Sequence, residues 1–452
     1  MKSPSFYFGL YMALIGGNWI AYHLILPIRI AHHILLTVFL VWWLFKRGLP
    51  DTPMILPIGL LALVVGLSGV NAIDRRMALE YGWHWLTNWL LFLYLIDAIR
   101  PEQGDSYFLA MFAAGGLLSA SCIIEWMLSM GTSRPAGMFG VINLTGAFLA
   151  ALIVPAVGWA IATQNRTERG WLIGLTALLT IAVVLNQSRG PVLSIVLALN
   201  VFAFLTLKTH PLLKMSFGVG VMGLCAWIVV GLSAQPQHSS GDVVRLDLWK
   251  AGGELLMDYP TGVGAGLFPQ AYHLLTSSGD RYTGAHNYYI NLGAELGAPG
   301  LAASAAFCLV ALYVLIGQKR TMRENAVLAA LVGVLAQMVG DNYPAQNWTF
   351  LLSLYLAYLL REARLFNQPI PVLVNRLLIY ALLVYGLLFA NWDIAQFHYE
   401  KALQLHSPDE IEAALAFDPH NRLYALEAER FHNPAIVISS DYAITNFARI
   451  GY

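Results

Sequence analysis

Charge is the property that this sequence lacks most clearly. Only 12% of its 452 residues are Asp, Glu, Lys or Arg, whereas hydrophobic residues make up 58%. Soluble domains carry about 25% charged residues, and the mean hydropathy of this chain is +0.61. Because so little charge cannot cover a water-exposed surface, the composition predicts a membrane protein embedded in the lipid bilayer.

Two further shortages exclude other classes of protein. Lys plus Arg and Asp plus Glu both number 26, so the chain lacks the basic excess of a nucleic-acid binder. Cys122, Cys225 and Cys308 lie far apart in apolar runs, which indicates neither a disulfide framework nor a zinc site. The sequence has no Asp-x-Asp pair and no His/Cys cluster with metal-ligand spacing. We therefore expect no metal, no cofactor and no nucleic-acid partner.

Long apolar runs dominate the remaining sequence, and a helix needs about 20 apolar residues to cross the hydrocarbon core. Thirteen runs qualify as candidate spans: 6–26, 30–45, 54–72, 79–98, 107–129, 140–163, 171–187, 190–207, 212–233, 299–317, 325–340, 347–360 and 373–391. With the N-terminus in the cytoplasm, the inner loops hold most of the Lys and Arg residues, as the positive-inside rule requires. The sequence predicts an all-α, polytopic transmembrane helical protein with about 12–13 spans.

Two segments are too polar to lie in the membrane. Residues 234–298 are rich in Gly, Ser, His and Tyr and are predicted to form a large extracytoplasmic loop within a transmembrane domain of residues 1–392. Residues 393–452 are predicted to form a polar helical tail. In the tail, an Ala/Leu helix that ends in Asp418-Pro419-His420-Asn421 looks like a fragment of a helical repeat.

Four ionisable residues that are distant in sequence fall on the outer face of the predicted topology. They are Arg189, Arg245, His286 and Asp341. Polar groups in membrane proteins are costly and therefore mark candidate sites. Arg189, in a Ser-Arg-Gly-Pro turn, is either an interface anchor or a phosphate clamp. Arg245, in a predicted interfacial helix, is either a solvated charge or a second cation for a pyrophosphate.

Residues of the outer loops supply the other candidate groups. His286 lies in a polar stretch with Asn and Tyr neighbours, and a neutral imidazole suits a general base. Asp341 either caps a helix end or orients a catalytic His or Arg. Gly262, Gly264 and Gly266 alternate along the chain, which lets a ligand or another backbone segment approach closely.

At these residues the sequence resembles the O-antigen ligase and polymerase superfamily. Four stretches in the family's order carry the resemblance: Arg134–Gly140 with Asn143 (R-x-x-G-x-F-x-x-x-N); Ser188-Arg189-Gly190 (S-R-G); Arg245–Phe268 (R-x-x-x-W running into P-x-G-x-G-x-G-x-F); and His286-Asn287-Tyr288 with Glu295–Gly300 (H-N-x-Y and E-x-G-x-x-G). The resemblance covers residues of about 130–345 and excludes the tail.

The resemblance implies a helical glycosyltransferase that works without a metal ion. By analogy, Arg189 and Arg245 hold the carrier pyrophosphate, and His286 activates an acceptor hydroxyl that attacks the anomeric carbon with inversion. Supporting roles fall to Asp341 and to five of the matched residues: Asn287, Tyr288, Arg134, Gly264 and Gly266.

The expected activity is transfer of a glycan from polyprenyl (undecaprenyl) pyrophosphate to an acceptor at the periplasmic face of a bacterial inner membrane. In an O-antigen ligase of lipopolysaccharide biosynthesis the acceptor is lipid A–core. Two sibling readings keep the same donor: a polymerase that extends a glycan, and an oligosaccharyltransferase that modifies a protein. A lipid-linked glycan flippase and a non-catalytic scaffold are the rivals from other classes. The enzyme interpretation requires Arg189, Arg245 and His286 to meet.

Overall fold

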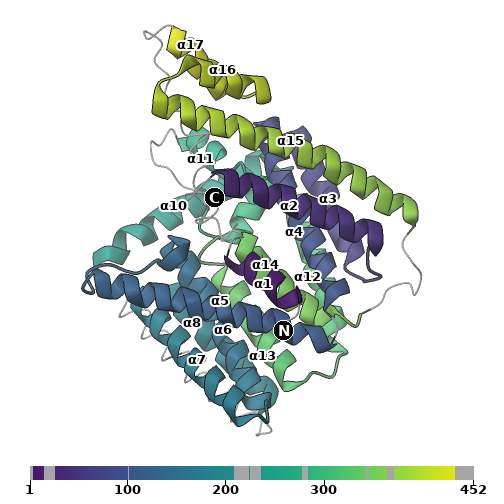
Figure 1. The fold of residues 1–452 in the computed structure, drawn as a ribbon, viewed down its shortest axis with the longest axis vertical. Helices are drawn as coiled ribbons and strands as arrows, with labels where there is room; N and C mark the ends of the chain where they lie inside the picture. Colours follow the sequence, from purple (N-terminus) through teal and green to yellow (C-terminus); the bar gives the residue numbers. More distant parts are fainter. Residues whose placement is uncertain are drawn as a thin grey trace.

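The computed structural model describes residues 4–14, 26–99, 101–207, 223, 236–276, 284–342, 346–363 and 371–432, and every regular element in these ranges is a helix (Figure 1). The first half contains α1 (Pro4–Leu14), α2 (Leu26–Lys46), α3 (Ile55–Val70), α4 (Arg75–Ala98), α5 (Pro101–Leu128), the short 3-10 helix η2 (Gly137–Phe139), α6 (Ile142–Ala162), α7 (Arg166–Asn186) and α8 (Arg189–Thr206). The second half contains α10 (Pro236–Asp258), α11 (Phe268–Thr276), α12 (Tyr288–Ile316), α13 (Met322–Gln337), α14 (Gln346–Leu360), α15 (Val372–Leu405), α16 (Pro408–Phe417) and α17 (Arg422–His432).

Six of the described helices are long and apolar enough to cross a membrane. They are Gly104–Leu128 within α5, and α6, α7, α8, α12 and α15. Three shorter apolar helices add to them: Ile30–Lys46, Ile55–Val70 and Trp348–Leu360. The prediction of a polytopic all-α membrane protein is therefore confirmed. The predicted runs 6–26 and 212–233 lie largely outside the described residues.

The division of residues 171–207 into two spans agrees with the structure. Gln187 adopts a left-handed conformation with φ of 55°, which ends α7. Ser188 then precedes the first residue of α8, Arg189. Because this short turn separates two apolar helices, Arg189 lies at the beginning of a helix rather than inside a span.

Helix α6 lies at the centre of a group formed with α7, α8 and α13 (Figure 1). Of the 18 consecutive residues of α6 that are most apolar, 89% are buried inside the protein. Small residues let its neighbours approach closely: a Cβ atom added to Gly158 would lie 2.3 Å from the Cβ of Ala326 on α13. In membranes such close packing of small residues holds helices together, because lipid provides no hydrophobic drive between them.

Residues 234–298, predicted as one polar loop, are largely helical in the structure. They contain α10, α11 and the first turns of α12. Leu248, Ala251 and Leu255 form a buried stripe on α10 and pack in one cluster with Phe268 and other apolar residues. This spacing follows the helical period, and the polar composition of the segment concealed it.

The tail is continuous with the last membrane helix. α15 passes the predicted boundary between residues 392 and 393 without a break, and α16 and α17 pack at its end (Figure 1). The cluster between them consists of Ala395, Tyr399, Ala402, Ile411, Ala414, Tyr424 and Ala428. Asn421 donates a 3.3 Å hydrogen bond to Asp418 within the Asp-Pro-His-Asn turn.

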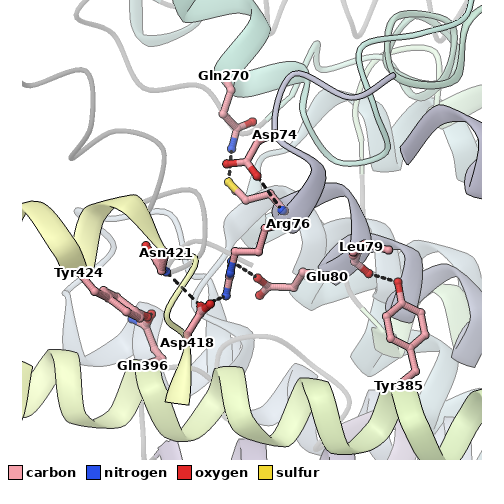
Figure 2. A network of polar contacts seen from close by, with 11 residues as sticks. Asp74, Arg76, Leu79, Glu80, Gln270, Tyr385, Gln396, Asp418, Asn421 and Tyr424 are labelled. Atoms are coloured by element: carbon pink, nitrogen blue, oxygen red, sulfur yellow. Dashed lines mark hydrogen bonds and ion pairs between the residues drawn. The ribbon is translucent and has the colours of Figure 1, made fainter. Parts of the chain in front are cut away.

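An ion pair joins this turn to the membrane domain (Figure 2). The Nη2 atom of Arg76 on α4 lies 2.5 Å from the buried carboxylate of Asp418. Its Nη1 atom donates a 3.0 Å hydrogen bond to Glu80, and its guanidinium lies 4.9 Å from the ring centroid of Trp392. Arg76 thus holds both α15, at Trp392, and the turn between α16 and α17 against α4.

We expect Arg76→Ala to loosen the tail. Asp418 would keep a buried negative charge after losing its cation, a change that costs about 3–5 kcal/mol in other buried pairs. The melting temperature of the purified protein should fall, and limited proteolysis should cut within residues 393–432 sooner. Arg75→Ala is the matched control, because Arg75 is exposed and donates to the nearby Val70 carbonyl. Equal behaviour of the two variants would contradict this role of Arg76.

Candidate functional site

A chain of hydrogen bonds runs through four separate regions of the sequence. Arg134 donates through Nη2 to Ser188 Oγ at 2.9 Å and through Nε to the carbonyl of Asn186 at 3.1 Å. Ser188 donates to Asn143 at 3.3 Å, and Asn143 donates to Asp341 at 2.9 Å. The chain ends at His286, whose Nδ1 lies 3.0 Å from Asp341 Oδ1.

The carboxylate of Asp341 is the centre of this chain. Its Oδ2 accepts from Asn143, and its Oδ1 accepts from the His286 ring and from the backbone N–H of Asn342 at 2.9 Å. The Asp341 side chain is 10% exposed, whereas the His286 side chain is 33% exposed. A carboxylate that accepts from Nδ1–H leaves the lone pair on Nε2 of the neutral ring. The open imidazole is thereby oriented as a proton acceptor.

The backbone around His286 is held in an unusual conformation. His286 has φ of 48°, in the left-handed region. Asn287 then caps α12, accepting from the N–H groups of Tyr289 and Ile290 at 3.0 and 3.1 Å. The N–H of Tyr288 donates to the carbonyl of Met338 at 2.9 Å, which ties this turn to the chain just before Asp341. Asn287 and Tyr288 therefore position His286 through their backbone and capping bonds.

Glu295 supports the same turn from inside α12, a role that the sequence motif alone did not predict. Its Oε1 accepts from the Asn291 amide at 2.7 Å, and Asn291 in turn accepts from the backbone N–H of Ala285 at 3.1 Å. Its Oε2 accepts from the backbone N–H of Gly266 at 2.9 Å. One buried carboxylate thus connects the turn of His286 with the glycine segment.

The glycine segment repairs a break in α12. Pro299 has no N–H for the carbonyl of Glu295, which instead accepts from the N–H of Gly264 at 3.0 Å. The N–H of Ala298 donates to Pro260 at 2.9 Å, and the carbonyl of Ala294, left without it, accepts from Val263 at 3.0 Å. The P-x-G-x-G and E-x-G-x-x-G motifs therefore form one joint.

The alternating glycines allow close approach of the protein to itself. A Cβ atom on Gly266 would lie 2.0 Å from the ring of Tyr81, and one on Gly264 would lie 2.7 Å from Ala72. Both residues also have positive φ, at 72° and 112°. The sequence left two explanations for these glycines, the close approach of a ligand or of another backbone segment. Contact with the protein's own chain explains Gly264 and most of the surroundings of Gly266.

Arg189 brings a second guanidinium to the same region. It is half-buried at the N-terminus of α8, directly after Ser188, which belongs to the hydrogen-bonded chain. Burial lowers the pKa of Arg134, and the positive charge of Arg189 lowers it further. Two nearby cations and a helix N-terminus favour an anion at this place.

Like the roles of the other predicted site residues, the role of Arg245 stays a prediction. It is half-buried on α10, a helix that packs against α12. The hydrogen-bonded chain traced above through the described residues runs from Arg134 to His286 without it. The structure brings together Arg134, Arg189, His286 and Asp341.

A cavity of about 580 Å³ adjoins the site. Tyr288 and Asn342, chain neighbours of the network, line it together with Asn291, Glu295 and Gly266. Apolar side chains of α3, α4, α12, α13 and α14 form most of the remaining wall. Among the described residues, no group of three His, Cys, Asp or Glu side chains is placed to hold a metal ion.

The joint in α12 makes Gly297 intolerant of a side chain. Gly297 has φ of 67° and ψ of −165°, and a Cβ atom there would lie 2.3 Å from the carbonyl oxygen of Pro260. We expect Gly297→Ala to destabilise the protein by about 3 kcal/mol or more, through backbone strain and overlap. Gly317→Ala, at the C-cap of the same helix, is the control, because among the described residues beyond its chain neighbours no atom lies within 4 Å of its added Cβ. Similar melting temperatures for both variants would contradict the joint.

Comparison with protein-family models matches residues 174–305 to a family described as O-Antigen ligase. The matched segment includes Arg189, Arg245, His286 and Glu295, whereas Arg134 and Asp341 lie outside it. Over these residues the match supports the resemblance to the O-antigen ligase and polymerase superfamily that the motifs predicted. A search of curated proteins gave no match.

Proposed function

We propose that this protein is a glycosyltransferase that moves a glycan from a polyprenyl pyrophosphate carrier to an acceptor hydroxyl. The reaction takes place at the outer face of a bacterial inner membrane, as in an O-antigen ligase. The observation that carries the proposal is the hydrogen-bonded chain from Arg134 to His286. It connects a cationic region to an oriented base, the two components that displacement of a pyrophosphate requires.

His286 is the proposed general base. Its Nε2 takes the proton of the acceptor hydroxyl as the acceptor oxygen forms a bond to the anomeric carbon of the donor. The bond from that carbon to the carrier pyrophosphate breaks on the opposite face, so the configuration inverts. Asp341 stabilises the resulting imidazolium through Nδ1, as the carboxylate of a Ser-His-Asp triad does.

Arg134 and Arg189 are the proposed pyrophosphate ligands. The leaving pyrophosphate carries more negative charge as the bond breaks, and preorganised guanidinium groups stabilise that charge. Arg245 is proposed to supply a third cation from α10. These arginines provide charge that a metal ion supplies in other transferases, so the proposed reaction is metal-independent.

The acceptor separates the members of this class. A ligase takes lipid A–core, a polymerase takes a second carrier-linked glycan, and an oligosaccharyltransferase takes a protein hydroxyl. A flippase is the alternative of another class. The open imidazole of His286 with its buried Asp341 favours the enzyme, because such a pair is suited to proton abstraction from an acceptor hydroxyl.

We expect His286→Ala to lower turnover by about 10²–10⁴-fold while leaving donor affinity nearly unchanged. Asp341→Asn should also lower turnover, because an amide no longer selects the Nδ1–H tautomer. Transfer from a polyprenyl pyrophosphate glycan to candidate acceptors measures both effects. His273→Ala is the control, because this histidine on α11 is not one of the residues of the hydrogen-bonded chain traced from Arg134 to His286. If His286→Ala transfers glycan as fast as wild type, the assignment of the base is wrong.

Arg189→Ala should weaken binding of the donor by about 10–100-fold, the effect of losing one or two charge-assisted hydrogen bonds. Arg189→Lys should recover only part of the affinity, because an ammonium cannot form the paired bonds of a guanidinium. Titration with a non-transferable polyprenyl pyrophosphate analogue measures this. Arg166→Ala is the matched control, since Arg166 is exposed at the first residue of α7. Unchanged affinity in Arg189→Ala would remove Arg189 from the site.

A further inference from the structure

A second histidine–aspartate pair lies at another part of the cavity wall. The Nδ1 atom of His33 on α2 is 2.7 Å from Oδ2 of Asp393 on α15, and the two side chains are only 6% and 5% exposed. His33 is also one of the residues that line the cavity. Ionisable groups buried among membrane helices are costly, and by default they mark function.

The ring of His33 is fixed in orientation. The edge-on ring of Phe389 lies 4.6 Å away between centroids, and the rings of His32 and His84 lie 5.7 and 6.0 Å away. Both neighbouring histidines line the cavity as well. In the described part of the chain, Asp393 is the hydrogen-bond partner of the His33 ring.

Nε2 is the ring nitrogen of His33 that remains for a ligand. His33 lines the cavity, and its Nδ1 is engaged with Asp393. Nδ1–H donates to the Asp393 carboxylate, so Nε2 of the neutral ring is an acceptor and requires a donor such as a hydroxyl. A phosphate without a proton does not match it.

The rest of the cavity wall is mainly apolar, so the molecule that carries this hydroxyl should itself be largely apolar. Trp85, Trp89 and Phe92 continue the wall along one side of α4, and aliphatic residues of α12 and α13 face them. Ligand sites of this volume usually combine an apolar wall with a few polar groups that fix orientation. The complementary ligand is an amphipathic lipid with a hydroxyl group.

We propose that His33, held by Asp393, binds a hydroxyl group of a lipid-anchored substrate in this cavity. The inference rests on the proposed function, and it extends the substrate site from Asn342, beside Asp341, to the wall formed by α2. A carrier-linked donor and a lipid-linked acceptor share the required chemistry. His33 is a binding residue here, and the proton transfer remains with His286.

Labelling of Cys308 tests binding without any transfer reaction. Cys308 lines the cavity and is exposed, whereas Cys122 is buried. In a Cys225→Ser background reconstituted in nanodiscs, a maleimide should modify Cys308, and a bound lipid should slow the reaction. The probes are a long-chain polyprenol, its O-methyl ether, which lacks the hydroxyl proton, and the corresponding polyprenyl phosphate.

We expect polyprenol to protect Cys308 at about tenfold lower concentration than its methyl ether, the difference that one hydrogen bond makes. In the double variant His33→Ala/Asp393→Ala the two probes should protect equally. Removing both partners avoids an unpaired buried charge, so the variant should fold. The matched control is His398→Ala/Glu410→Ala, a pair with the same 2.7 Å distance in the tail, which should retain the wild-type preference.

Three results would overturn the proposal: no protection by polyprenol, equal protection by polyprenol and its ether in wild type, or stronger protection by the phosphate. A transfer assay then identifies the substrate, because the double variant should raise KM for the donor or for a lipid acceptor. Unchanged KM for both would overturn the link to the substrate. If wild type binds polyprenol selectively but transfers no glycan, the proposed function fails and the hydroxyl site stands.

Discussion

The shared carboxylate of Asp341 is the interaction on which the candidate site depends. One oxygen accepts from His286 and from the backbone of Asn342. The other accepts from Asn143, which continues the hydrogen-bonded chain toward Arg134. These groups come from the first turn of α6, from the loop before α12 and from the loop after α13. A single buried anion thereby sets the position of the imidazole relative to the cationic region, and it compensates part of the charge gathered there.

The fold class and part of the site were predictable from sequence, because each had a strong local signal. Apolar run length and Lys/Arg placement predicted the helices, and the Ser-Arg-Gly turn separated α7 from α8 correctly. The motifs around His286 and Arg189 indicated residues that the structure places in one region. The link through Ser188 and Asn143 was not predictable, since a hydrogen bond between distant segments leaves no periodic pattern in one sequence.

Residues 234–298 show why composition misleads where helices and tight turns alternate. Glycine and polar residues suggested a loop, yet Gly262, Gly264 and Gly266, each with positive φ, lie against α12, the turn between α3 and α4, and α4 respectively. The glycine segment supplies the backbone hydrogen bonds that the helix loses where proline breaks it. The backbone hydrogen bond from Gly264 to Glu295 is part of this arrangement, and it depends on how the two segments lie in three dimensions.

The tail has the appearance of a detachable module, yet two buried polar pairs join it to α2 and α4. Asp393 is hydrogen-bonded to His33 on α2, and Asp418 forms an ion pair with Arg76 on α4. A chain that ended before residue 393 would leave the His33 ring and the Arg76 guanidinium without these partners. Exchange of this tail between homologous proteins would therefore require compensating changes in α2 and α4, so the three segments are constrained to evolve together.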